Sequence, residues 1–303
     1  MQTETAPLVA GIELGGTKCI AILAHSPDSV VERVRIDTTT PDATLGAIDD
    51  VLRRWRSERP VSALGIASFG PLQLDPAADN FGSIVATPKP GWNDSDVFGR
   101  FAATMGVPAA IQTDVNAAAM AEARWGAAKG LSAHCYITVG TGVGVGAVID
   151  GKPVQGAMHG EAGHMRTVRA EGDDFAGHCP YHRDCTEGLV SGPAIAARFG
   201  MPGDAIPDDD ARWRFVVHDF AAMLHNLVVT LAPERISIGG GVMAGRQGLL
   251  PAIRAALVES LAHYGLADVY CRTIDERVGP PGLGDLAGPM GAIAMGLSAL
   301  KNR

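Results

Sequence analysis

Apolar and polar positions alternate along the chain in two ways, which predict strands and helices in both halves of the sequence. Short apolar runs bounded by glycine or proline predict buried strands, and apolar positions repeated every three to four residues predict helices. Strands are expected at residues 8–14, 18–24, 61–71, 108–112 and 235–242, and two more, separated by a glycine turn, are expected within residues 133–150. Helices are expected at residues 44–58, 97–106, 113–130, 211–231, 248–263 and 288–302. This mixture predicts an α/β protein.

One layout occurs twice. "LVAGIELGGTKCIAILA" and "AHCYITVGTGVGVGAVID" each consist of a strand, a glycine turn and a second strand, about 125 residues apart. A repeat of this kind indicates two related lobes. We place the first lobe at residues 1–115 and the second at 116–287, with an irregular loop at 159–187. The last helix, about 288–303, is a candidate to pack back on the first lobe.

Composition and charge narrow the function. The 303 residues, 47% of them hydrophobic, suffice for two apolar cores. A net charge of −8 and the absence of basic runs argue against nonspecific binding to nucleic acid or anionic membranes. No signal peptide and no apolar stretch of about 20 residues is recognisable. We therefore expect a cytoplasmic protein, in which cysteines stay reduced.

Three glycine-rich turns follow apolar strands. Such turns expose backbone N–H groups and let phosphate oxygens approach closely, so three of them together indicate a nucleotide site. We expect N–H groups from the first two glycines, a hydroxyl contact from the threonine that follows them, and a weaker role for the next lysine. The candidate phosphate ligands are Gly15, Gly16, Thr17, Lys18, Gly140, Thr141, Gly142, Gly144, Gly239, Gly240 and Gly241.

Two common nucleotide motifs do not fit these turns. "GIELGGTK" resembles a Walker A motif, but it ends in Thr-Lys and continues into a strand where a P-loop requires a helix. "GVGVGA" satisfies a loose dinucleotide pattern, yet it also continues into a strand. Glycine hairpins that hold phosphates between two lobes are instead typical of the actin and sugar-kinase type of fold.

Two carboxylates lie where a phosphoryl-transfer reaction could use them. Asp114, in "QTDVNAAA", is at a transition from strand to helix, which suits a helix N-cap and also a general base for a hydroxyl group. Glu13 is a charged residue in an apolar strand directly before the first glycine turn. It either reaches solvent or holds Mg²⁺, directly or through water.

The segment "CPYHRDC" has the spacing of a metal site. Cysteine and histidine at two-residue gaps can surround one Zn²⁺ ion, which takes four ligands at tetrahedral corners. Cys179, His182 and Cys185 are three candidate ligands. The fourth has to come from elsewhere, with His164 preferred and His178 and His159 as alternatives. A polar loop with incidental cysteines is the competing interpretation.

Seven motifs together carry a family resemblance. In order they are "GIELGGTK", "SFGP", "TDVNAAAMAE", "GTGVGVG", "EAGH", "CTEGLVSGPA" and "GGGV". Over essentially its whole length the chain resembles the ROK family of sugar kinases and repressors. "TPKPGW" and "CPYHRDC" are similar to the bacterial fructokinase branch. The resemblance implies a two-lobed, ribonuclease H-like, actin-like ATPase fold with an interlobe cleft, and a homodimer.

The resemblance also implies roles for individual residues. Asp114 would be the general base, and His164 would contact the sugar while serving as a zinc ligand. Zinc would be structural, since four protein ligands leave no open position. The implied sugar contacts are Gly70, Thr113, Asp114, Glu161, His164 and Glu187.

Two departures from the wider family matter. Its usual pattern is C-x-C-G-x-x-G-C-x-E, whereas here His178 and Pro180 occupy the first two cysteine positions, which leaves the zinc ligand set open. Thr113 precedes Asp114 where glucose and N-acetylhexosamine kinases of the family usually have asparagine. This second departure fits the fructokinase resemblance.

The expected function is phosphorylation of fructose to fructose 6-phosphate, with ATP and Mg²⁺ and with a structural Zn²⁺. Mannose, glucose or another hexose is the alternative within enzymes. A sugar-responsive regulator is the alternative from another class, but the first glycine turn begins at residue 15, which leaves no room ahead of it for a DNA-binding domain. A catalytically dead sugar-binding module is disfavoured because Asp114 and all three turns are present.

Overall fold

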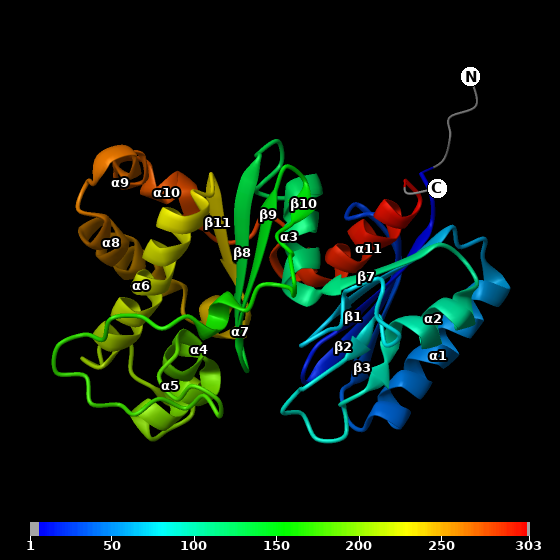
Figure 1. Cartoon of the computed structure of the whole chain (residues 1–303), viewed down its shortest axis with the longest axis horizontal. Helices are drawn as coiled ribbons and strands as arrows, with labels where there is room; N and C mark the ends of the chain where they lie inside the picture. The colour runs from blue at the N-terminus through cyan, green and yellow to red at the C-terminus, as the bar shows by residue number, and fades with distance from the viewer. Residues whose placement is uncertain (1–5, 302–303) are drawn as a thin grey trace. The chain divides into compact units, whose positions relative to one another are not determined.

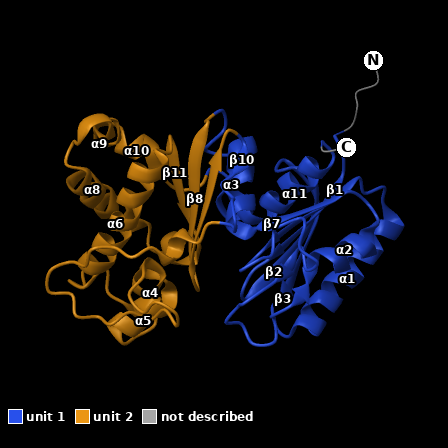
Figure 2. Cartoon of the chain, viewed as in Figure 1, with its two compact units in different colours: residues 1–130, 151–159, 282–303 blue, residues 131–150, 160–281 orange. Residues whose placement is uncertain are grey.

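The structure is a computed structural model that describes residues 6–301. They form two compact units (Figure 2). The first unit comprises the residues up to Gly130, Gly151–His159 and the residues from Gly282 on, and the second comprises Leu131–Asp150 and Gly160–Pro281. The boundary expected at residue 115 therefore differs from the observed one. The helix that follows Asp114 stays in the first unit because it packs against the last helix of the chain.

A five-stranded sheet forms the centre of the first unit (Figure 1). The first strand is antiparallel to the second and parallel to the fourth, which is in turn parallel to the seventh. In the order β3-β2-β1-β4-β7, the strands are β3 (Ser29–Asp37), β2 (Lys18–Ser26), β1 (Val9–Leu14), β4 (Ala63–Ser68) and β7 (Ala109–Thr113). The predicted glycine hairpin at residues 15–18 joins β1 to β2.

Helices cover both faces of this sheet (Figure 1). Ile12 and Leu14 point to a core shared with α1 and α2, whereas Val9 packs with the last helix, as alternation along a strand requires. Gly291 lets the last helix approach α3, because a Cβ there would lie 2.6 Å from the backbone of Ala117. The helices are α1 (Pro41–Glu58), α2 (Val97–Met105), α3 (Asp114–Trp125) and α11 (Ala287–Ala299), and a short hairpin pairs β5 (Ser83–Ile84) with β6 (Ser95–Asp96).

The sheet of the second unit repeats the topology of the first. Its order is β10-β9-β8-β11-β12, in which β8 is antiparallel to β9 and parallel to β11. The strands that belong to the second unit are β8 (Ala133–Val139), β9 (Val143–Ile149), β11 (Arg235–Gly239) and β12 (Val278–Gly279), whereas the two-residue β10 (Lys152–Pro153) lies within the Gly151–His159 segment assigned to the first unit. The repeated layout in the sequence therefore corresponds to two sheets with equivalent strand orders.

The helices of the second unit surround one large apolar core. They are α4 (Thr186–Val190), α5 (Gly192–Phe199), α6 (Trp213–Leu231), α7 (Gly241–Gly245), α8 (Leu250–Leu261), α9 (Asp268–Arg272) and α10 (Ile274–Arg277). Short 3₁₀ turns accompany them: η1 (Ala162–His164), η2 (Gly203–Ala205), η3 (Gln247–Leu249) and η4 (Gly265–Ala267). Between residues 6 and 301, no helix combines the length and the apolar character needed to cross a membrane.

The third glycine turn differs from the other two. Gly239 ends β11, and the chain passes through Gly240 directly into α7, so no hairpin forms. Gly240 has a φ of 89°, and a Cβ there would lie 2.4 Å from the backbone of Val139. Glycine is therefore required at position 240, because the backbone there takes a positive φ and lies close to the end of β8.

A buried ionic network fixes the irregular segment of the second unit. The guanidinium of Arg198 donates to Asp173 at 2.9 Å and to Asp219 at 2.8 Å, and Arg169 donates to Asp173 at 2.6 Å. The side chains of Arg198, Asp173 and Asp219 are at most 3% exposed. Since breaking one partner of a buried ion pair is strongly destabilising, this network holds residues 169–175 against α5 and α6.

Candidate active site and metal centre

Three predicted site segments leave the first sheet at the same edge. Leu14 of β1 lies opposite Ser68 of β4, and Ser68 lies opposite Thr113 of β7. Because these three strands are parallel, the residues that follow them meet at one edge, where ligands of α/β proteins bind. The glycine turn from residue 15, the loop that contains Gly70, and Asp114 are therefore brought together although they are far apart in the sequence.

Asp114 does not cap its helix. The N-cap of α3 is Thr113, whose Oγ1 accepts the Asn116 N–H at 3.3 Å, and Asp114 is the first helical residue. The N-cap prediction was thus wrong by one residue, because β7 extends through Thr113. One carboxylate oxygen of Asp114 accepts the Val115 N–H at 2.8 Å. The hydroxyl of Thr113, an implied sugar contact, is engaged in capping.

Glu13 and Asp114 are close enough for the charge of Asp114 to affect the pKa of Glu13. Burial, followed by the negative charge of Asp114, raises the pKa of Glu13 to about 7, although Lys18 and Arg33 act in the opposite direction. The carboxylate of Glu13 rests on α11 at Gly288, where a Cβ would lie 1.9 Å from its Oε1. Two neighbouring carboxylates that oppose each other's ionisation form a suitable environment for a divalent cation.

The raised pKa of Glu13 predicts a pH-dependent stability. Between its ordinary value of 4.5 and about 7 the folded protein keeps a proton that the unfolded chain has lost. Stability should therefore fall as pH rises through this interval and stay lower above it. We expect Glu13→Gln to raise Tm at pH 8 by about 2–4 °C, equivalent to about 1 kcal/mol, and to leave it unchanged at pH 4. Thermal unfolding without Mg²⁺ at both pH values is the measurement, and an equal effect at both would contradict the argument.

The first glycine turn offers fewer N–H groups than predicted. The Gly15 N–H donates to the Lys18 carbonyl at 3.0 Å and closes the hairpin, so this N–H is already used within the turn. The Gly15 carbonyl accepts from Thr38 Oγ1 at 2.8 Å. Gly16 and Thr17 remain the candidates for phosphate contacts in this turn.

Lys89 is a candidate that sequence reasoning missed. Its Nζ donates to the Gly16 carbonyl at 2.6 Å and brings a positive charge to the first glycine turn. Lys89 belongs to "TPKPGW", whose buried Trp92 anchors the segment by donating from Nε1 to the Thr39 carbonyl at 3.0 Å. A single lysine between two prolines carries no local pattern that predicts this contact.

The second glycine turn is built like the first. The Gly140 N–H donates to the Gly142 carbonyl at 2.9 Å and is therefore already used within the turn. Gly144 lies beyond the turn, in β9, where it is paired with Thr138 of β8. Glu187, an implied sugar contact, accepts the Val143 N–H at 3.0 Å through Oε2. Thr141 and Gly142 remain as phosphate candidates, with Glu187 supporting the turn.

Four predicted zinc ligands converge in the second unit. The ligand atoms of His164, Cys179, His182 and Cys185 all lie within 4.8 Å of one another. His164 Nδ1 is 3.5 Å from Cys185 Sγ, and His182 Nδ1 is 3.9 Å from Cys179 Sγ. Zn–S and Zn–N bonds at a tetrahedral angle would separate sulfur from nitrogen by about 3.5 Å. The donor set and its spacing therefore fit one Zn²⁺ ion.

Local structure explains this convergence. Cys179 and Arg183 exchange backbone hydrogen bonds, and Arg183 has a φ of 57°, so the chain folds back sharply between the two cysteines. Burial raises the pKa of the Cys185 thiol to about 12, and the adjacent Cys179 adds to this effect. A cation would allow both sulfurs to be thiolates.

The alternative fourth ligands lie elsewhere. Among residues 6–301, the cluster of ligand atoms includes neither His178 nor His159. The His178 N–H donates to the Gly188 carbonyl, and His159 belongs to the first unit, where it contacts Leu72.

The implied sugar ligands divide between the units. Gly70, Thr113 and Asp114 belong to the first, and Glu161, His164 and Glu187 belong to the second. Glu161 immediately precedes η1. The glycine of "EAGH" is required there, because a Cβ on Gly163 would lie 1.8 Å from the Val143 carbonyl.

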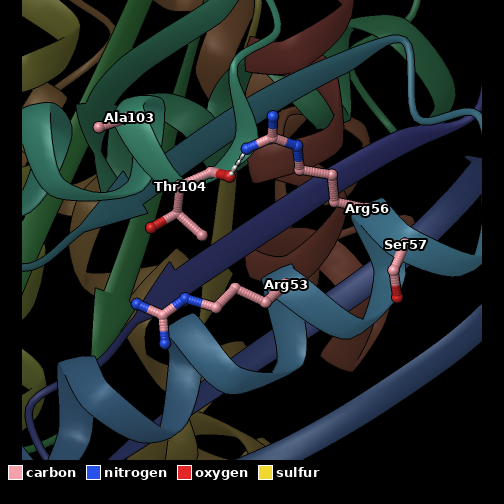
Figure 3. Close-up of a pocket in the computed structure, with 5 residues that line it drawn as sticks. All are labelled: Arg53, Arg56, Ser57, Ala103 and Thr104. Carbon is pink, nitrogen blue, oxygen red and sulfur yellow. Dashed lines mark hydrogen bonds between the residues drawn. The ribbon is translucent and has the colours of Figure 1, made fainter.

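A surface cavity of about 640 Å³ lies outside the predicted site (Figure 3). It is lined by Arg53, Arg56, Ser57, Ala103 and Thr104 of α1 and α2. Arg56 donates to the Thr104 carbonyl at 2.7 Å across it. None of the predicted site residues lines this cavity.

Comparison with known proteins identifies the family. The ROK family profile matches residues 9–298, so the chain belongs to the ROK family. It is 41% identical over 295 residues to a fructokinase of Pediococcus pentosaceus, covering 97% of this chain and 99% of the relative. It is 42% identical over 295 residues to a fructokinase of Zymomonas mobilis, covering 95% and 96%. The resemblance seen in the motifs is thus confirmed.

Solved structures show the same fold. A ROK family glucokinase from Streptomyces griseus, crystallised with glucose and AMPPNP, superimposes with a TM-score of 0.75 over 96% of this chain and 99% of that one, at 24% identity. The α/β fold with two related sheets is the actin-like sugar-kinase fold expected from the sequence.

Proposed function

We propose that this protein transfers the terminal phosphate of ATP to the 6-hydroxyl of fructose, giving fructose 6-phosphate and ADP. The fructokinase relatives that match almost the whole chain support this substrate. The observation that carries the proposal is the register of β1, β4 and β7, which brings a phosphate-binding type of turn and the Asp114 carboxylate to one sheet edge.

Asp114 is the general base in this proposal. Its carboxylate accepts the proton of the sugar hydroxyl as the hydroxyl oxygen bonds to the γ-phosphorus, and the bond from that phosphorus to the bridging oxygen of ADP breaks. Gly16, Thr17 and the turn at residues 141–142 bind the phosphates through backbone N–H and hydroxyl groups. Lys89 supplies positive charge near them.

Mg²⁺ fits the acidic edge of the first sheet. Glu13 would hold it directly or through water, and the ion would neutralise the charge that develops on the phosphates. Burial and the negative charge of Asp114, which raise the pKa of Glu13, disfavour its ionised form, and a bound cation would offset both effects.

Zn²⁺ is structural in this proposal. His164, Cys179, His182 and Cys185 would fill all four of its positions. His164 Nδ1 lies 4.0 Å from Glu187 Oε1, and Glu187 in turn binds Val143. The metal would therefore fix the implied sugar ligands and the adjoining glycine turn in one arrangement.

The proposed reaction can be tested by comparing sugars. ADP release would be measured at fixed ATP and Mg²⁺ with fructose, mannose, glucose and two N-acetylhexosamines. The largest kcat/KM is expected for fructose, with phosphate on its 6-hydroxyl by NMR. A larger value for another hexose would replace fructose as the substrate, and no release above background with any sugar would refute the kinase assignment.

A further inference from the structure

A tight turn at residues 155–159 contacts both segments that carry the predicted sugar site of the first unit. We propose that His159 and Gln155 are positioning residues, which hold the loop after β4 and the entrance of α3 in the arrangement that binds the sugar. This inference rests on the proposed function. The turn is closed by backbone pairing between Gln155 and His159, so both side chains are placed by one local structure.

His159 holds the loop that contains Gly70. Its Nε2 accepts the Leu72 N–H at 3.0 Å, and Leu72 and His159 are 5% and 3% exposed. A Cβ on Gly70 would lie 3.6 Å from the ring, so the imidazole also packs on the loop backbone. Because Nε2 is an acceptor, the ring proton resides on Nδ1. Without this acceptor a buried N–H would lose its partner, which costs about 1–3 kcal/mol.

Gln155 extends the contact to the strand before Asp114. Its Nε2 donates to the Leu74 carbonyl at 3.2 Å, and its Oε1 accepts from Gln112 Nε2 at 3.2 Å. Gln112 Oε1 in turn accepts the Thr113 N–H at 2.8 Å. A chain of hydrogen bonds therefore runs from the loop after β4 to the residue before the proposed base.

These contacts link two segments that the sheet alone would leave independent beyond its edge. The pairing of β4 with β7 ends at Ser68 and Thr113, and within residues 6–301 no further pairing of these two strands fixes the distance between Gly70 and Asp114. Misplacement of a substrate by about 1 Å can cost about 100-fold in rate.

The test compares two substitutions at His159. We expect His159→Ala to raise the KM for fructose about tenfold, with the KM for ATP changed less than about twofold and the zinc content unchanged. His159→Gln should restore most of the fructose affinity, because its amide oxygen can accept at the position of Nε2. His25→Ala, at a half-buried histidine of β2 in the same unit whose Nδ1 bonds the Ala6 carbonyl, is the matched control and should keep the wild-type KM for fructose.

Gln155→Ala provides a second, independent variant. It should raise the KM for fructose severalfold with little change for ATP, and it carries the test alone if His159→Ala does not fold. The inference is overturned if fructose KM is unchanged, if the KM values for both substrates rise equally, if zinc is lost, or if His159→Gln fails to rescue. If the wild type phosphorylates no sugar, the proposed function itself fails and this inference falls with it.

Discussion

Asp114→Asn is expected to lower kcat for fructose by about 10²–10⁴-fold, the range attributable to a general base. Asparagine has nearly the same shape and can still accept the Val115 N–H that Asp114 binds. It cannot take the proton of the attacking hydroxyl at neutral pH. The loss should therefore appear in turnover, while fructose binding measured by calorimetry stays within a few-fold of the wild type.

Asp96→Asn is the matched control for this substitution. Asp96 caps α2 in the same unit by accepting the Gly99 N–H at 2.7 Å, and asparagine is an equally good N-cap. Near-normal kcat is expected. Since Thr113 rather than Asp114 caps α3, a loss of helix stability does not explain a low kcat in Asp114→Asn. Near-normal turnover of that variant would show that another group takes the proton.

Local sequence patterns predicted most strands of the first sheet but not β3, the polar strand at one side of it. The buried strands β1, β2, β4 and β8 are apolar runs, and the sequence places them correctly. β3 was missed because most of its side chains are exposed and several are charged. An edge strand of this kind is stabilised by pairing with β2, which no local pattern reveals.

Only the parts of the site that follow from residue type and local spacing could be predicted from the sequence. The C-x2-H-x2-C spacing singled out Cys179, His182 and Cys185, which do lie together. The commitment of the Gly15 N–H to its own hairpin depends on turn geometry, and glycine content alone does not show it. Lys89 and His159 act through contacts 73 and 87 residues away along the chain, and such contacts leave no periodic signal.

Removal of zinc is the second large effect that we expect. Cys185→Ala should retain less than about a tenth of an equivalent of zinc and lose about 100-fold or more in kcat/KM for fructose. Loss of a structural metal can lower the free energy of unfolding by more than about 4 kcal/mol. We therefore expect Tm to fall by about 10 °C or more. Metal analysis of chelator-free protein, kinetics and thermal unfolding are the measurements.

Cys135→Ala is the matched control for the zinc experiment. Cys135 is a buried cysteine of β8 in the core of the same unit, and burial alone raises the pKa of its thiol to about 12. Its replacement should leave the zinc content at one equivalent and shift Tm by only a few degrees. Less than about half an equivalent of zinc in the wild type, or full activity of Cys185→Ala, would contradict a structural zinc site.

The place where the zinc-free protein loses order can also be predicted. Arg198, Asp173 and Asp219 should still hold residues 169–175, because that network does not involve the metal ligands. The sharp turn at Arg183 would lose the ligand bonds on both sides of it. Trypsin should then cut after Arg183 in zinc-free protein and much more slowly after zinc is restored, with Mg²⁺ giving no protection. Equal cleavage with and without zinc would mean that the hydrogen bonds between Cys179 and Arg183 hold the turn by themselves.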